Sequence, residues 1–194
     1  MNVMIPDKKI IRRELFEAIA AIPPEVRADK SRAICEAVAA LDEFHAAKVV
    51  MLYLPIAGEV DTALLADLAW EAGKQVCAPK FCGDSRRMSP REILSHHACS
   101  FHNGHGLRSP ASTVELLLAE IDVVIVPAVG FDPSCNRLGR GGGFYDRFLQ
   151  QAELHATTIG VGFSEQICPK LPIEPHDTPL DAVVVDGAVY RCGG

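Results

Sequence analysis

The residues of this chain that could carry chemistry are concentrated in one glycine-rich stretch. Its sequence is Asn136-Arg137-Leu138-Gly139-Arg140-Gly141-Gly142-Gly143-Phe144-Tyr145-Asp146. An apolar run at residues 121–126, typical of a buried strand, precedes it, and a helix is expected from Phe144 to Ala152. Glycines allow the backbone to approach a ligand closely. A helix N-terminus adds free amides and a partial positive charge, so this connection favours an anionic ligand.

Two arginines and an aspartate make that expectation more specific. Arg137 and Arg140 carry forked donors that suit phosphate oxygens, and Asp146 could hold a divalent cation against those oxygens. The pattern therefore predicts a site for a nucleoside triphosphate with magnesium. The alternative is a tight turn with solvated arginines, in which Asp146 only complements the helix dipole. Neither a Walker A motif nor a dinucleotide-binding glycine motif is present.

Hydrophobic periodicity predicts the elements that must position this stretch. A first helix is expected from Asp7 to Ile22 and a second from Pro24 to Leu41, with Val26, Ile34, Val38 and Leu41 facing inward. Further helices are expected at 62–72 and 112–119, and strands at 48–54, 75–78, 121–126, 157–162 and 182–185. Because strands alternate with helices, the sequence predicts an α/β fold with a mostly parallel sheet, in one domain that spans residues 1–194.

Residues 80–110 are expected to be irregular, with a hairpin near 88–94 and a histidine-rich loop at 95–105. Four histidines and Cys99 could suggest zinc, but they lack the usual ligand spacing, so a surface loop without metal is expected. The chain has seven cysteines at irregular spacings. They predict reduced, structural thiols that are neither catalytic nor metal-bound, rather than a disulfide framework.

Composition limits the classes of partner. The 194 residues are 48% hydrophobic and 23% charged, as in ordinary globular proteins. A net charge of −6 argues against a general nucleic-acid binder. No run of 18 or more apolar residues predicts a membrane span, and no apolar stretch at the start predicts a secretory signal. A cytoplasmic location, with neither nucleic acid nor membrane as partner, is therefore expected.

The central stretch resembles the signature of the 5-formyltetrahydrofolate cyclo-ligase family, also called methenyltetrahydrofolate synthetases. The similar segments are Val126-Pro127-Ala128-Val129-Gly130-Phe131-Asp132 and the stretch from Asn136 to Asp146. Lys8 with Arg12, and Tyr53-Leu54-Pro55 with Gly58-Glu59-Val60-Asp61-Thr62, resemble two further family segments. Leu107-Arg108-Ser109-Pro110 departs from the family, because Ser109 stands where the family has glutamate or glutamine.

The resemblance implies a three-layer α/β/α fold with a Rossmann-like sheet of the NagB/RpiA/CoA transferase type. It also implies roles for individual residues. ATP would contact Lys8, Arg12, Arg137, Leu138, Gly139, Arg140, Gly141, Gly142, Gly143, Phe144 and Tyr145. The folate would contact Leu54, Glu59, Arg140, Gly141, Gly142, Gly143 and Phe144. Arg140 and Tyr145 would be catalytic, and Asp146 and Asp181 would hold Mg²⁺.

The implied reaction converts 5-formyltetrahydrofolate and ATP into 5,10-methenyltetrahydrofolate, ADP and phosphate, catalysed by a monomer. Two alternatives stay open at this point. One is a catalytically silent relative that binds nucleotide or folate as a regulatory module. The other is an isomerase of the phosphosugar type on a similar fold, although such an enzyme would need no ATP. From the sequence without the resemblance, Glu59 would be a solvated loop residue, and Lys8 and Arg12 two surface cations.

Overall fold

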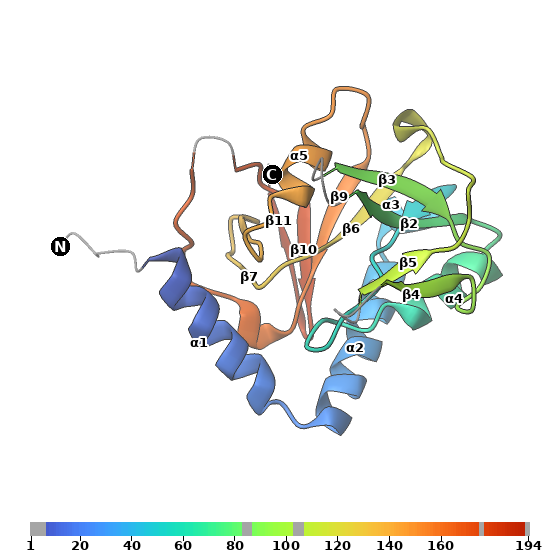
Figure 1. The fold of residues 1–194 in the computed structure, drawn as a ribbon. Coiled ribbons are helices and arrows are strands. Elements are labelled where there is room, and N and C mark those ends of the chain that lie inside the picture. The colour runs from blue at the N-terminus through green and yellow to red at the C-terminus, as the bar shows by residue number, and fades with distance from the viewer. Residues whose placement is uncertain (1–6, 83–86, 103–106, 175–176, 193–194) are drawn as a thin grey trace.

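The structure is a computed structural model that describes residues 7–82, 87–102, 107–174 and 177–192 (Figure 1). Its centre is a seven-stranded sheet in the order β11-β10-β9-β6-β1-β2-β3. These strands are β1 (Val49–Met51), β2 (Gln75–Cys82), β3 (Arg87–Glu92), β6 (Val123–Pro127), β9 (Thr157–Val161), β10 (Ala182–Val185) and β11 (Ala188–Arg191). The five inner strands pair in parallel, and the edge strands β3 and β11 are antiparallel. The predicted α/β fold with a mostly parallel sheet is confirmed.

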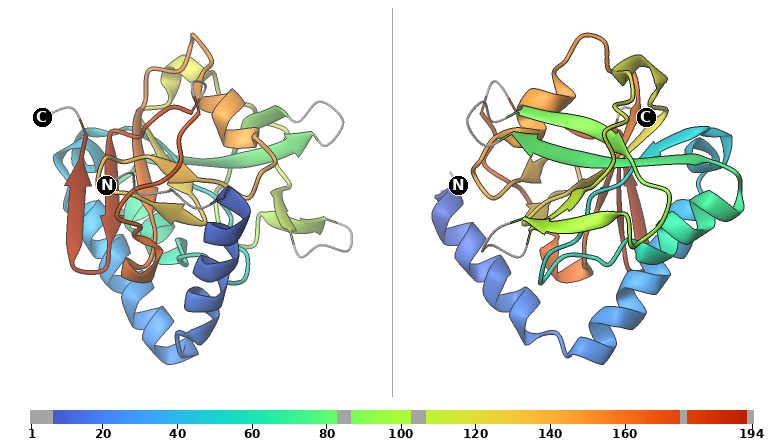
Figure 2. Two further views of the ribbon diagram at one scale, coloured as in Figure 1. Left: turned by 90° about the vertical axis from the view of Figure 1, so that its left-hand side faces the viewer. Right: turned by 45° about the vertical axis from the view of Figure 1, so that its right-hand side comes forward.

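Alternate residues of the inner strands point to opposite faces of the sheet, as the strand period requires. Val50 and Ile125 belong to the core on one face, which α2 (Pro24–Ala39), α3 (Asp42–Ala46) and α4 (Ala63–Glu71) cover. Met51 and Val124 belong to the core on the other face. That face is covered by α5 (Phe144–Leu149) and by the small hairpin of β7 (Gly130–Phe131) and β8 (Arg137–Leu138). The strands therefore separate α2 from α5 (Figures 1 and 2).

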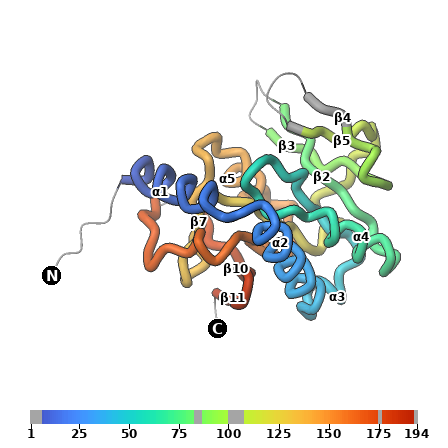
Figure 3. The backbone as a smooth tube through the Cα atoms, turned by 90° about the horizontal axis from the view of Figure 1, so that it is seen from below, coloured from blue at the N-terminus to red at the C-terminus, as the bar shows by residue number. Residues whose placement is uncertain are grey.

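Helix α1 (Lys8–Ala21) connects the core to the glycine-rich stretch. Its C-terminal half joins the core on the α2 face. Its N-terminal half packs through Ile11 and Leu15 against Val129, which precedes β7, and Leu138, which lies in β8. The apolar stripe of α1 thereby brings its first turns beside the segment that leads into the glycines. Seen from below, α1 and the β4–β5 hairpin lie at opposite ends of the molecule (Figure 3).

The region from 80 to 120 differs from the sequence-based expectation. Where a hairpin was expected near 88–94, the structure has one strand, β3, and its hairpin partner is the preceding strand β2. Part of the expected histidine-rich loop is a second hairpin, β4 (Cys99–His102) with β5 (Leu107–Pro110), which lies alongside the first (Figure 2). The helix predicted at 112–119 is wrong. Only a 3-10 turn is present there (η1, Leu118–Glu120), because the preceding backbone pairs with β3 through Glu92 N–H to Val114 O at 3.1 Å and Leu116 N–H to Pro90 O at 3.1 Å.

Other boundaries agree better with the prediction. The helices expected at 7–22, 24–41 and 62–72 are present as α1, α2 and α4. Ile34 and Val38 are fully buried as predicted, but Val26 is 40% exposed, so the prediction that it faces inward is wrong. The short 3-10 turn η2 (Ser164–Gln166) follows β9. Among the described residues, no helix is long and apolar enough to cross a membrane.

Candidate active site

The glycine-rich loop is shaped by backbone conformations that suit glycine. It leaves β8 at Gly139 and ends at Gly143, the residue before α5. Gly141 has φ +100° and Gly143 has φ +65°, where a side chain would be strained. A Cβ on Gly139 would meet no atom within 4 Å, so space is open beside that backbone. The loop therefore exposes backbone next to the N-terminus of the short helix α5.

Arg137 and Asp146 are brought together at the two ends of this loop. Arg137 Nη2 donates to Asp146 Oδ1 at 2.6 Å, and only 4% of the Arg137 side chain is exposed. Burial lowers the pKa of Arg137, and the Asp146 carboxylate opposes that shift. Arg137 Nε and the Tyr145 hydroxyl are buried and have no hydrogen-bond partner within the described parts of the chain. Buried donors without a partner are costly, so these two atoms are suited to bind a ligand.

Arg140, at the middle of the loop, reaches the folate-side segment predicted from the sequence. Its Nε and Nη2 both lie 3.3 Å from Glu59 Oε1. Its guanidinium carbon lies 5.3 Å from the centre of the Phe16 ring on α1. Sequence reasoning did not identify Phe16. The available signal was an aromatic residue one turn beyond Arg12 on the same helical face.

Glu59 follows β1 at the carboxyl edge of the sheet, where open α/β sheets place their ligands. Its Oε2 accepts from Ile56 N–H at 3.2 Å. Burial raises the pKa of Glu59 although Ile56 N–H and Arg140 both favour the carboxylate. Tyr53, which sequence reasoning assigned no role, is buried nearby and donates its hydroxyl proton to Val60 O at 2.8 Å. Burial, and then the Glu59 charge, raise the pKa values of both Tyr53 and Tyr145.

The two cations of α1, Lys8 and Arg12, each have a specific partner. Arg12 Nε donates to Gly139 O at 2.8 Å, which ties the helix to the first glycine. Lys8 Nζ lies 3.0 Å from both Glu174 and Asp177. Burial lowers the pKa of Lys8, but the hydrogen bonds and charges of these carboxylates outweigh it, and the net shift is upward. Lys8 and Arg12 are thus positioned by specific contacts and are not simply solvated cations.

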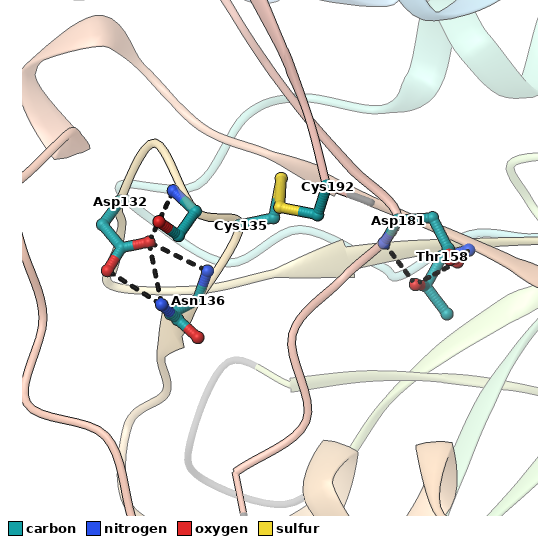
Figure 4. Close-up of a disulfide and its surroundings, with 7 residues drawn as sticks. Asp132, Cys135, Asn136, Thr158, Asp181 and Cys192 are labelled. Atoms are coloured by element: carbon teal, nitrogen blue, oxygen red, sulfur yellow. Dashed lines mark hydrogen bonds between the residues drawn. A yellow bond between two sulfur atoms is a disulfide. The ribbon is translucent and has the colours of Figure 1, made fainter. Parts of the chain in front are cut away.

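Asp181 is engaged elsewhere. Its Oδ2 accepts from Thr158 N–H and from the Thr158 hydroxyl, both at 2.7 Å (Figure 4). These residues stand at the amino ends of the parallel strands β10 and β9, whereas Glu59 and the glycine-rich loop lie at the carboxyl edge. The structure therefore does not bring Asp181 to Asp146. Within the described ranges, no group of three or more His, Cys, Asp or Glu side chains could hold a metal ion.

Cys135 and Cys192 form a disulfide, with Cα atoms 6.0 Å apart (Figure 4). The prediction of reduced thiols is wrong for this pair, because the fold brings the end of β11 to the turn before β8. The other five cysteines are thiols. Burial raises the pKa of Cys35 to about 11 and that of Cys77 to about 12, which keeps both protonated at neutral pH. His105, the last histidine of the loop that was expected to bind no metal, lies outside the described residues.

Ser109, the residue that departs from the family pattern, is buried on β5 opposite Ser100. Leu54 follows β1 beside Tyr53, and both line a small hollow that also includes Arg108. Ser109 therefore belongs to the hairpin that borders the folate-side segment, while Leu54 lies at its edge.

The fold and these contacts define a class of protein: an α/β protein whose glycine-rich loop meets a half-buried carboxylate at the carboxyl edge of the sheet. The sequence model of the 5-formyltetrahydrofolate cyclo-ligase family matches residues 4–186. The chain is 29% identical over 189 residues to the 5-formyltetrahydrofolate cyclo-ligase of Mus musculus, covering 92% of this chain and 93% of the mouse protein. It is 38% identical over 151 residues to that of Escherichia coli K12, covering 75% and 81%.

A solved structure agrees with this relationship. The NMR structure of the Aquifex aeolicus 5,10-methenyltetrahydrofolate synthetase superposes with a TM-score of 0.84 at 28% identity, covering 96% of this chain and 93% of that chain. The chain thus belongs to the 5-formyltetrahydrofolate cyclo-ligase family, whose members are enzymes of folate one-carbon metabolism.

Proposed function

We propose that this protein cyclises 5-formyltetrahydrofolate to 5,10-methenyltetrahydrofolate with ATP and Mg²⁺, releasing ADP and phosphate. One observation carries the proposal: the glycine-rich loop contacts Arg12 through Gly139 and Glu59 through Arg140. A single loop therefore contacts both a cation of α1 and a half-buried carboxylate. Such an arrangement can hold a phosphate donor and a hydrogen-bonding heterocycle next to each other.

The ATP side would consist of the loop amides, Lys8, Arg12 and Arg137. The open space beside Gly139 supports a close approach of phosphate to the backbone. Arg137 Nε, which has no partner in the described parts of the chain, supports the same assignment, because a guanidinium can offer two donors to one phosphoryl group. Phosphoryl transfer depends mainly on positioning and charge neutralisation, which these groups supply.

Mg²⁺ fits this site through Asp146. The Asp146 side chain is 30% exposed and has one oxygen engaged by Arg137. Magnesium typically takes one or two carboxylates together with phosphate oxygens, so a single protein carboxylate is sufficient when ATP supplies the rest. When bound, the ion would neutralise charge on the phosphates. Because Asp181 is held by Thr158, we propose Asp146 without Asp181 as the protein ligand.

The folate side would be Glu59 and Leu54, with Gly141, Gly142, Gly143 and Phe144 opposite. A pterin presents amino and ring N–H groups, and a half-buried carboxylate is a suitable acceptor for them. Arg140 already directs two N–H groups at the same Glu59 oxygen, which supports that type of recognition.

The chemistry requires activation of the formyl oxygen, because oxygen is a poor leaving group from a formamide. Transfer of the γ-phosphoryl group to that oxygen gives an imidate-like phosphate. The folate N10 then attacks the formyl carbon and loses its proton to the departing phosphate, while the C–O bond breaks and phosphate leaves. Arg140 would stabilise charge on the phosphoryl group during transfer. The Tyr145 hydroxyl, which is buried and has no partner among the described residues, would donate to an oxygen of the same group.

An absorbance assay for the methenyl product tests this function. Purified protein is mixed with 5-formyltetrahydrofolate, ATP and Mg²⁺, and each is omitted in turn. We expect product only in the complete mixture, with one ADP formed per methenyl group. Binding of ATP or folate without product would instead indicate a silent regulatory relative, and product without ATP would contradict the proposed mechanism.

A further inference from the structure

One buried carboxylate close to the glycine-rich loop has no part in the reaction described above. Asp132 follows β7 and is only 1% exposed. Its Oδ1 accepts from Ser134 N–H and from Asn136 N–H, both at 3.0 Å, and Asn136 Nδ2 donates to the two carboxylate oxygens at 3.1 and 3.0 Å (Figure 4). Burial of a carboxylate is costly unless donors of this kind surround it. The Asp132 carboxylate therefore fixes the backbone of the turn at residues 132–136.

This turn leads directly into Arg137. Two backbone hydrogen bonds close it, from Asp132 N–H to Asn136 O at 3.1 Å and from Cys135 N–H to Asp132 O at 2.9 Å. Arg137 begins β8, and its side chain, which is 4% exposed, pairs with Asp146. Because a buried side chain packs closely against its surroundings, its place depends on the backbone that carries it. The turn therefore sets where the Arg137 guanidinium lies.

The same turn also holds both ends of a second segment, residues 171–180. At one end, Leu171 N–H donates to Asp132 Oδ2 at 3.0 Å. At the other end, Leu180 N–H donates to Cys135 O at 3.0 Å. The carboxylate that orders the turn is thus also the anchor for the start of this segment.

The segment between these two anchors positions Lys8. Lys8 Nζ lies 3.0 Å from both Glu174 Oε1 and Asp177 Oδ2. Glu174 N–H donates to the same Asp177 oxygen at 2.8 Å, which holds the two carboxylates together. Asp132 is therefore connected to two cations, to Arg137 through the turn and to Lys8 through the segment.

We propose that Asp132 is a positioning residue for the ATP side of the site. The inference rests on the proposed function, which assigns Arg137 and Lys8 to the phosphates. Asp132 acts on them through the backbone and does not touch ATP itself. Glu59, on the folate side, has other anchors, because it bonds to a backbone amide and to Arg140. Loss of the Asp132 carboxylate should therefore weaken ATP binding selectively.

The test is Asp132→Asn, which keeps the shape of the side chain but replaces one acceptor oxygen by a donor. An amide cannot accept on both sides, so either Leu171 N–H or the amides of the turn lose their acceptor. Hydrogen bonds that orient the ligands of a metal site typically change affinity by about 10–100-fold when they are removed. In calorimetry with ATP and Mg²⁺ and without folate, we expect binding about tenfold weaker, with the KM for 5-formyltetrahydrofolate unchanged.

Asp122→Asn is the matched control. Asp122 accepts from Lys48 N–H at 2.7 Å and from Val49 N–H at 2.8 Å, so it makes the same kind of carboxylate–amide bond. It lies at the amino ends of β1 and β6, whereas the site lies at the carboxyl edge of the sheet. Both variants should melt at a lower temperature, because each leaves a backbone amide without its acceptor. Only Asp132→Asn should lose affinity for ATP.

Asn136→Ala is a second, milder variant, and it decides alone if Asp132→Asn does not fold. It removes the two side-chain bonds to Asp132 and leaves the backbone bonds of the turn, so it should lose less ATP affinity than Asp132→Asn. Unchanged ATP affinity in the folded variants would overturn the proposal. Equal losses for ATP and folate would also overturn it, because Asp132 would then act only through the stability of the fold. Failure of the proposed function is distinguishable, since the unmodified protein would then form no methenyl product.

Discussion

Arg140→Lys provides a direct test of how the glycine-rich loop contributes to catalysis. Arg140 Nε and Nη2 share one Glu59 oxygen at 3.3 Å, and 46% of the Arg140 side chain is exposed. Lysine keeps the positive charge but cannot offer two parallel donors. The substitution therefore separates the contribution of charge from that of the forked geometry.

The two contributions differ enough in size to be told apart. In the ground state, the ion pair with Glu59 is long and partly exposed, so it is worth about 1 kcal/mol or less. The contact with Phe16 adds about 0.5–1 kcal/mol at an exposed site. KM values should thus change by about thirtyfold at most. A donor that meets developing charge is worth more, and removing it should lower kcat by about 10²–10³-fold.

Steady-state rates, with ATP and 5-formyltetrahydrofolate varied in turn, give both quantities. The control is Arg13→Lys, an exposed α1 residue whose partner Glu17 lies 3.9 Å away. It should have the kinetics of the unmodified protein. If Arg140→Lys keeps its kcat while Arg140→Ala loses it, charge alone is sufficient. If both variants turn over normally, Arg140 is a solvated loop residue and its catalytic role is refuted.

Four further predictions concern Glu59, Asp146, Gly139 and the cysteines. Glu59 must be ionised to accept pterin N–H groups, and its pKa is raised above the ordinary value of 4.5. As the pH falls, kcat/KM for the folate should therefore begin to decrease at a higher pH than an ordinary glutamate would give. Glu59→Gln should remove this loss at low pH and weaken folate binding by about 1.5–3 kcal/mol, with ATP binding unchanged in calorimetry. Asp146→Asn should raise the Mg²⁺ concentration needed for half-maximal rate, and normal activity at limiting Mg²⁺ would exclude Asp146 as a ligand. Gly139→Ala should have a free energy of unfolding within about 1 kcal/mol of that of the unmodified protein, because the added Cβ meets no atom within 4 Å, yet it should bind ATP less tightly. A loss of folding stability as large as the loss of ATP affinity would indicate a structural role instead. Thiol titration of denatured, unreduced protein should give five groups, with no stoichiometric zinc, and seven would contradict the Cys135–Cys192 disulfide.

The parts of the fold that were predictable from sequence are those with a local signal. The apolar stripe of α1 and its stop at Pro23 identify that helix without any tertiary information. Gly73 follows the C-terminal end of α4 and has φ +72°, a left-handed conformation that glycine adopts readily and that stops the helix. Continuous apolar runs mark the inner strands because both faces of a parallel sheet are buried.

The errors occur where tertiary pairing determines the structure. Residues 112–119 have helical spacing, but their backbone pairs with the edge of β3. The β4–β5 hairpin has a polar, histidine-rich sequence that gives little strand signal on its own. Cys135 and Cys192 are separated by 57 residues, so nothing in their spacing indicates that they meet. In each case the partner lies in a distant part of the chain.

The candidate site combines both situations. The loop from Gly139 to Gly143 was visible as a pattern, and the physical argument for an anion site needed only its glycines and arginines. Glu59 was different, because 81 residues separate it from Arg140 and only the resemblance to a family selected it. The fold explains why the two meet. The parallel strands β1 and β6 end at one edge of the sheet, so the loop that follows β1 and the β7–β8 hairpin that follows β6 meet there, beside the first turns of α1. A carboxylate that is unremarkable in sequence thereby gains a half-buried position, a raised pKa and an arginine partner, and these properties make it testable as the pterin-binding group.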